Sequence, residues 1–416
     1  MSSESGKRKA WSVLAYTVAD DRADSNALDA SVGRELKSIC SGADFAELSV
    51  AVQVDFKRST GVFRGVLAEA PPMTRSPSGF EDIHARSNPL WRAVRARLQH
   101  SKLRLLKERI DLNAARASVL KEFLHFGVKE CPADRHLVFF YGHGYGPLGL
   151  FYDEDPDHTD RKTMPLRGLA RSLESMGGNA AVILFRACQA GTLEAVYELR
   201  DAGEFMIASQ AIVPIAGAWP WETLLTSLTR SAESGDVARS IAQQLALFLT
   251  PFSNRKPLGD VPCSVIDLGA ARAIVEPLKA LARALDGARR NPVRSAACAA
   301  AMEHARVGFP GDHSQPGDPA LLDVATMCDH LQKLGGDPVA GPARALGKVV
   351  MSRLVKFQHS QHGLHRGVAL YCKPVKNSER SHIYDKRFEA ADDPRYRKLA
   401  LSRATGWDRI ALNPLK

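Results

Sequence analysis

Short apolar runs alternate with stretches of helical period along most of this sequence, and this alternation constrains the fold more than any other feature. The runs have the β-branched and aromatic content of buried strands; they are WSVLAYTVA (11–19), ELSVAVQVDF (47–56), HLVFFYG (136–142), AAVILFRAC (180–188) and EFMIASQ (204–210). Amphipathic stretches such as LRGLARSLESMGG and TLEAVYELRDAG separate them. We therefore predict an α/β fold with a mostly parallel sheet flanked by helices.

The sequence beyond residue 210 predicts a helical end to the same body. VPCSVIDL (261–268) is strand-like and leads into a helix that ends near residue 287. Residues 295–335 are mainly helical in pattern around the break GFPGDHSQPGD, and GVALYCKP (367–374) is one more strand. We predict a core over residues 10–287 and a mainly helical C-terminal portion over 288–416 with a returning strand.

Composition and charge argue against several classes of protein. Of 416 residues, 45% are apolar and 25% are charged, which is normal for a globular protein. No apolar run approaches the ~20 residues of a membrane helix, so no membrane partner is expected. The formal net charge of +10 invites a nucleic-acid partner. The basic residues are scattered, however, without a zinc-finger or RNA-binding signature, and nucleic acid is not the partner that we expect.

The cysteines fit a reducing compartment. Seven are spread along the chain without a CxxC pair, which predicts neither a disulfide framework nor a metal site. The first twenty residues contain a short basic stretch and an apolar run, but no small-residue cleavage pattern. A cytoplasmic location is the resulting expectation.

Two of the predicted strands end in reactive side chains between small residues. His143 follows HLVFFYG and Cys188 closes AAVILFRAC. Because ligands gather at the carboxyl ends of parallel strands, neighbouring strands would bring the thiol and the imidazole together, as nucleophilic catalysis requires. The backbone amides of Gly144 and Cys188 would then form an oxyanion hole. Either residue alone is more often structural, but the matched positions favour a catalytic dyad.

These residues also match a known pattern. His143 precedes Cys188 by 45 residues, and caspases place their histidine about 50 residues before the cysteine of Q-A-C-x-G. RACQAG (186–191) is close to that signature, and WSVLAYTVADD and ASQAIVPIAGAWPW (208–221) have counterparts in one family. Over about residues 10–412 the sequence resembles the clostripain family of the caspase-like clan of cysteine peptidases.

The resemblance implies a Cys188–His143 dyad, a caspase-like fold and no required organic cofactor. Some family members depend on calcium and on internal cleavage between the histidine and cysteine strands. The acidic loop at 152–162 is a candidate for either role, or is simply a solvated loop. Its candidate self-cleavage residues are Asp153, Asp155, Asp157 and Asp160.

Two residues depart from the family pattern. Arg186 stands where the family usually has Asp, and Gln210 stands where it usually has Glu. A guanidinium in a substrate pocket would reject Arg or Lys and would hold a carboxylate, so cleavage after Asp is predicted. The alternative is that Arg186 pairs with an internal acid and that a preference for Arg or Lys survives. Ser209, Gln210 and Trp219 are further candidates for substrate contact, although core packing would equally account for the tryptophan.

The predicted function is therefore limited proteolysis of protein substrates by a cysteine endopeptidase. The resemblance adds a stress or defence role, with a gasdermin-like or other effector as a candidate substrate. A catalytically idle caspase-like binding module is the alternative from another class, and a nucleic-acid-binding protein is the third. The presence of both His143 and Cys188 argues against the idle module.

Overall fold

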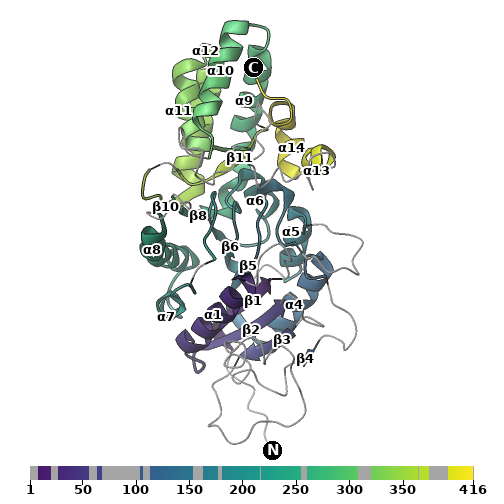
Figure 1. The fold of residues 1–416 in the computed structure, drawn as a ribbon, viewed down its shortest axis with the longest axis vertical. Helices are drawn as coiled ribbons and strands as arrows, with labels where there is room; N and C mark the ends of the chain where they lie inside the picture. Colours follow the sequence, from purple (N-terminus) through teal and green to yellow (C-terminus); the bar gives the residue numbers. More distant parts are fainter. Residues whose placement is uncertain are drawn as a thin grey trace, which may run out of the picture.

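The computed structural model describes residues 8–19, 27–55, 63–67, 104–105, 113–152, 163–176, 180–215, 217–253, 260–307, 320–363, 365–373 and 392–415. Within these ranges, nine strands form one sheet in the order β10-β8-β7-β6-β5-β1-β2-β3-β4 (Figure 1). The central strands β2, β1, β5, β6 and β7 pair with one another in parallel, while the pairs β2–β3, β3–β4, β7–β8 and β8–β10 are antiparallel. The predicted mostly parallel sheet is confirmed.

The bounds of β1, β2, β5, β6, β7 and β8 follow the predicted apolar runs closely, whereas β3, β4 and β10 lie outside those runs. The strands of the main sheet are β1 (Lys9–Val18), β2 (Leu48–Asp55), β3 (Phe63–Leu67), β4 (Arg104–Leu105), β5 (Ala133–Tyr141), β6 (Ala180–Arg186), β7 (Phe205–Ala208), β8 (Cys263–Asp267) and β10 (Val355–His359). β5 and β6 are buried along almost their whole length, because helices cover both faces of the sheet.

Successive side chains of these strands enter two different cores. Val182 and Leu184 of β6 belong to one core, while Ile183 and Phe185 belong to the other. The first core is completed by α1 (Ala27–Gly42), α7 (Trp221–Leu224) and α8 (Ser234–Ser253). The second contains α4 (Ala117–Glu130), α5 (Leu166–Glu174) and α6 (Leu193–Glu198), and continues into the C-terminal portion.

The C-terminal portion is mainly helical, as predicted, and packs on the end of the sheet (Figure 1). Its helices are α9 (Val275–Ala288), α10 (Pro292–His304), α11 (Val324–Leu334), α12 (Asp337–Val349), α13 (Asp392–Lys398), α14 (Ala400–Thr405) and α15 (Asp408–Ala411). The predicted strand at 367–374 is β11 (Ala369–Tyr371), which pairs with β9 (Leu321–Asp323) in a separate two-stranded sheet. The strand of this portion that joins the main sheet is instead β10.

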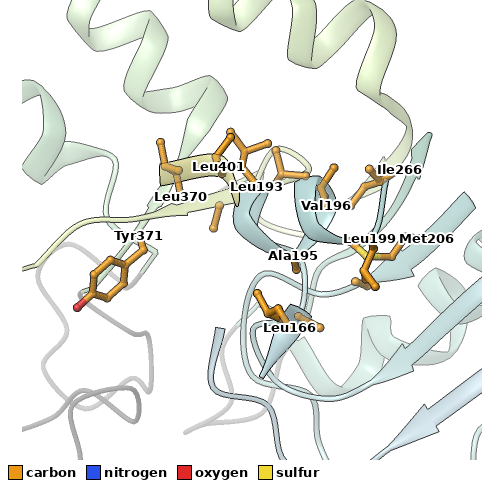
Figure 2. Close-up of a cluster of buried hydrophobic side chains, with 14 of the residues drawn as sticks. Leu166, Leu193, Ala195, Val196, Leu199, Met206, Ile266, Leu370, Tyr371 and Leu401 are labelled. Carbon is orange, nitrogen blue, oxygen red and sulfur yellow. The ribbon is translucent and has the colours of Figure 1, made fainter. Parts of the chain in front are cut away.

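Helix α6 is where the C-terminal portion meets the core. Leu193 and Val196 of α6 pack with Leu370 of β11 and Leu401 of α14 (Figure 2), and all four are completely buried. Fully burying an aliphatic side chain stabilises a fold by about 1.5–3 kcal/mol. One continuous apolar core therefore crosses the boundary that we predicted at residue 287.

Candidate active site

The ends of β5 and β6 place the two predicted catalytic residues side by side. The strands pair in parallel with Tyr141 opposite Arg186, and the Gly142 N–H donates to the Arg186 carbonyl oxygen (3.4 Å). His143 and Cys188 each follow two residues after these partners. Both residues therefore follow the ends of adjacent strands at the same edge of the sheet.

Gly144 holds the two strand ends in direct contact. A Cβ atom at this position would lie 1.9 Å from the Cys188 carbonyl oxygen and 3.0 Å from the Cys188 nitrogen. Only glycine permits so close an approach, since no heavy side-chain atom fits in that space. The structure thus brings together the backbones of Gly144 and Cys188, the two residues predicted to supply the oxyanion hole.

A tight turn fixes the position of His143. The Phe151 N–H donates to the His143 carbonyl oxygen (2.8 Å), and the Tyr145 N–H donates to the carbonyl of Gly149 (3.0 Å). The rings of His143 and Tyr145 lie 6.2 Å apart, and both are partly exposed. The histidine is thus held by backbone hydrogen bonds and is partly exposed, although its Nε2 atom is buried.

Cys188 is the one residue between 180 and 196 that is partly exposed, and the others are buried. Its sulfur accepts a hydrogen bond from the Val213 N–H (3.4 Å). Burial of the sulfur raises the pKa of the Cys188 thiol, and the Val213 hydrogen bond acts in the opposite direction. Because its pKa is raised, the thiol needs a base to become a nucleophile at neutral pH.

Arg186 points away from this edge and into the core beneath it. Its guanidinium is 1% exposed and forms an ion pair with Glu35 of α1. It also donates to the Gly217 carbonyl oxygen (2.7 Å) and lies over the ring of Tyr141 (4.6 Å to the centroid). The charge that was expected to face a substrate is compensated inside the protein, as in the alternative interpretation of this residue.

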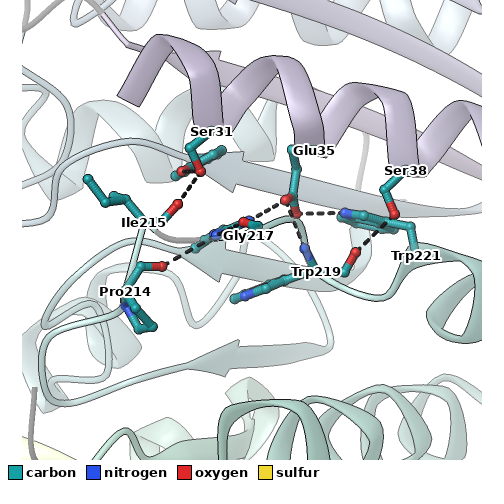
Figure 3. Close-up of polar contacts among 10 residues, drawn as sticks. Ser31, Glu35, Ser38, Pro214, Ile215, Gly217, Trp219 and Trp221 are labelled. Atoms are coloured by element: carbon teal, nitrogen blue, oxygen red, sulfur yellow. Dashed lines mark hydrogen bonds and ion pairs between the residues drawn. The ribbon is translucent and has the colours of Figure 1, made fainter. Parts of the chain in front are cut away.

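Helix α1 uses one face to hold the segment after β7 (Figure 3). Ser31, Glu35 and Ser38 are spaced so that they share that face. Ser31 donates to the Ile215 carbonyl, Ser38 donates to the Trp219 carbonyl (3.0 Å), and Glu35 accepts from the Trp219 N–H (2.9 Å). Glu35 also accepts from the indole N–H of Trp221 (2.6 Å). The segment that contacts the Cys188 sulfur is therefore anchored to α1.

The other predicted substrate-contact residues are also buried. Ser209 bonds to the backbone of Ala211, and Gln210 donates to Asp323 at the start of α11 (2.9 Å). Trp219 is 3% exposed and packs against Phe139, with ring centroids 5.9 Å apart. These side chains support the segment after β7 and present no free surface, so core packing is the account that the structure favours.

The acidic loop and its four aspartates lie outside the described residues. The described residues on either side, Tyr152 and Thr163, are both buried. Across the described ranges, no three His, Cys, Asp or Glu side chains gather closely enough to hold a metal ion. No helix in the described part of the chain is both long and apolar enough to span a membrane.

Two residues of the site were missed in the sequence. Glu35 lies 151 residues before its partner Arg186, in a helix whose pattern contains several other charged residues. A signal was present, because Glu35 falls on the apolar face of that helix, three residues after the buried Val32 and four before the buried Ile39. Val213 acts through its backbone N–H, and its side-chain type therefore gave no signal.

Comparisons with solved structures agree with the fold described above. The chain resembles a secreted C11 cysteine protease from Bacteroides thetaiotaomicron in complex with an irreversible peptide inhibitor (TM-score 0.63, 16% identity, 96% of this chain and 99% of that one). It also resembles an inactive zymogen C11 protease from Parabacteroides distasonis (TM-score 0.60, 16% identity, the same coverage). At these identities the likeness shows the fold. No curated protein matches the chain.

The sequence family is shown by a different comparison. The family model for the clostripain family, peptidase C11, matches residues 93–315, which is more than half of the chain and includes both His143 and Cys188. The chain therefore belongs to the clostripain family of cysteine peptidases.

Proposed function

We propose that this peptidase cleaves within protein chains and that Cys188 and His143 form its catalytic dyad. The observation that carries the proposal is the contact of Gly144 with the Cys188 backbone at the ends of two paired parallel strands. That contact aligns the end of β5, which precedes His143, with the end of β6, which precedes Cys188. It also places the backbones of the two expected oxyanion donors next to each other.

The chemistry follows from this placement. His143 takes the proton of the Cys188 thiol as the sulfur attacks the carbonyl carbon of the scissile peptide bond. The N–H groups of Gly144 and Cys188 stabilise the negative oxygen that forms, where each such donor is worth about 3–4 kcal/mol. His143 then protonates the leaving amine. Water, deprotonated by the same imidazole, hydrolyses the thioester to a free carboxyl group and the thiol.

The side chain before the scissile bond is a separate part of the proposal. The prediction of Asp depended on an uncompensated guanidinium, but Arg186 is paired with Glu35. With that pair intact, neither an acidic nor a basic substrate side chain gains a counter-charge from Arg186. The segment beside the sulfur is apolar, with Ile212, Val213 and Ile215. We therefore expect an uncharged residue before the cleaved bond, in place of Asp or of Arg and Lys.

Activation and location remain predictions drawn from the sequence. Internal cleavage in the loop at 153–160 would cut the chain between the histidine and cysteine strands. Calcium dependence is a separate prediction, in which the same loop would bind the ion. All seven cysteines are free, which supports a reducing compartment such as the cytoplasm. A gasdermin-like or other defence effector is the substrate class that we expect there.

The test is hydrolysis of three fluorogenic peptide sets that differ only in Leu, Asp or Arg before the scissile bond. Cys188→Ala and His143→Ala should each abolish turnover, while Cys298→Ala, at a buried thiol in α10, should keep it. Cleavage of the Asp or Arg set would keep the dyad and overturn the expected preference. Silence on all three sets, with and without added calcium, would favour the idle binding module.

A further inference from the structure

A hollow of about 520 Å³ lies between α5, α6 and α14, and none of its residues belongs to the site described above. Cavities of about 300–1,000 Å³ are typical of small-molecule sites. The hollow is lined from α5 by Arg167, Ala170, Arg171 and Glu174, from α6 and the residue after it by Tyr197, Glu198 and Arg200, and from the C-terminal helices by Lys398, Ala400, Arg403 and Ala404. Helices of the core and of the C-terminal portion therefore both line this hollow.

The lining is dominated by positive charge. Five of the eleven lining residues are Arg or Lys, and two are Glu. Of the two carboxylates, that of Glu198 accepts the N–H of Ala400 at the start of α14 (2.6 Å) and that of Glu174 is exposed, so five cations against two anions leave the lining a formal charge of +3. Four of these cations have no ion-pair partner within the described residues, and their side chains are exposed. They are Arg167, Arg171, Lys398 and Arg403.

The guanidinium of Arg200, which lines the same hollow, is held in a fixed orientation by the protein itself. It lies over the ring of Tyr197 (4.4 Å to the centroid), which holds its plane in place. Its ion-pair partner within the described residues, Asp201, lies 3.5 Å away and is shared with Arg272, which binds Asp201 more closely at 2.7 Å. The charge of Arg200 is therefore only partly compensated.

The packing below holds these cations close to one another. Leu193 and Val196 of α6 pack against Leu401 of α14, and Leu166 lies in the same buried cluster (Figure 2). Arg167 and Arg171 are four residues apart and so lie on one face of α5. Like charges fixed in this way repel one another, and a bound anion would relieve that repulsion.

We infer that this hollow binds a small polyphosphorylated molecule. Arg guanidinium groups match phosphate oxygens in pairs, and four such groups with one ammonium exceed the need of a single phosphate. The hollow is partly open, and its cations line one pocket of limited volume. This favours a small ligand over a long nucleic acid, whose backbone would need an extended basic stripe. The ligand would bridge α5 and α14, and would therefore fasten the C-terminal portion to the core.

The test uses the full chain with Cys188→Ala, so that no self-cleavage interferes, and titrates ATP, tripolyphosphate and AMP at constant ionic strength. ATP and tripolyphosphate should bind at least ten-fold more tightly than AMP and should raise the melting temperature. Tighter binding of ATP than of tripolyphosphate would mean that the hollow also holds a nucleoside. The triple variant Arg167→Gln, Arg171→Gln, Arg403→Gln should bind at least ten-fold more weakly.

The matched control is the triple variant Arg239→Gln, Arg283→Gln, Arg353→Gln, which removes the same charge from exposed positions outside the hollow. It should bind ATP and tripolyphosphate like the parent chain. Equal weakening in both triple variants would show a general charge effect and would overturn the inference. Failure of ATP and tripolyphosphate to bind, or binding of AMP as tightly as ATP, would overturn it as well.

Discussion

Replacing Gly144 by alanine is the sharpest test of the contact that defines the active site. The new Cβ would lie 1.9 Å from the Cys188 carbonyl oxygen, and real Cβ atoms essentially never approach another heavy atom within 3.0 Å. The two strand ends must therefore separate by about 1 Å. A misplacement of about that size costs roughly 100-fold in rate when it disturbs reacting groups. Overpacking of this kind also destabilises a fold by about 1–3 kcal/mol.

The assay measures kcat/KM on the best fluorogenic peptide together with the melting temperature. Gly144→Ala should lower kcat/KM by about 100-fold or more, with a fall of only a few degrees in the melting temperature. The control is Gly287→Ala in α9, where the added Cβ meets nothing within 4 Å. That change should leave activity intact and stabilise the helix by up to about 1 kcal/mol. If Gly144→Ala kept normal turnover, the strand-end contact would not position the dyad.

Three further predictions concern stability, measured by urea unfolding. Glu35→Gln leaves the buried guanidinium of Arg186 without its counter-charge and should cost about 3–5 kcal/mol, part of which Arg186→Gln in the same chain should restore. Burial lowers the pKa of His136 to about 4, so between pH 6.5 and 4 the unfolded chain takes up a proton that the folded chain does not. The free energy of unfolding should therefore fall by up to about 3 kcal/mol as the pH is lowered through that window. His136→Gln should flatten this dependence of stability on pH. Asp323→Ala removes the acceptor of Gln210 and the cap of α11, and should cost about 1–2 kcal/mol, whereas an unchanged free energy of unfolding would mean that this junction is not needed.

The central sheet was predictable because its signal is local. A buried parallel strand needs a run of apolar residues, and such runs marked β1, β2, β5, β6 and β7 to within a few residues. The direction of β8 was not predictable, since an apolar run is the same for either orientation. β10 has the sequence VKFQH and a half-exposed burial pattern, so it carries little strand signal of its own.

The placement of His143 and Cys188 at the ends of adjacent strands was predictable for the same reason, and the surroundings of Cys188 were not. Strand ends can be read from the sequence, whereas hydrogen bonds between distant backbone groups, such as that from Val213 to the sulfur, have no residue signature. Gln210 and Trp219 were candidates for substrate contact because they lie in a segment that resembles the family, where Gln210 replaces its usual Glu. Their burial depends on α1 and α11, which lie far away in the chain.

Strand geometry explains why Arg186 is not a substrate contact. Alternate residues of β6 face opposite cores, and Arg186 shares the side of Val182 and Leu184, which is the side of α1. A charge on that side has to find a partner inside the protein, and Glu35 supplies it. Because Glu35 also accepts the Trp219 N–H, the ion pair joins β6 to the segment that contacts the sulfur. The arginine two residues before Cys188 is therefore part of the frame that positions this cysteine, and its side chain is held inside the protein.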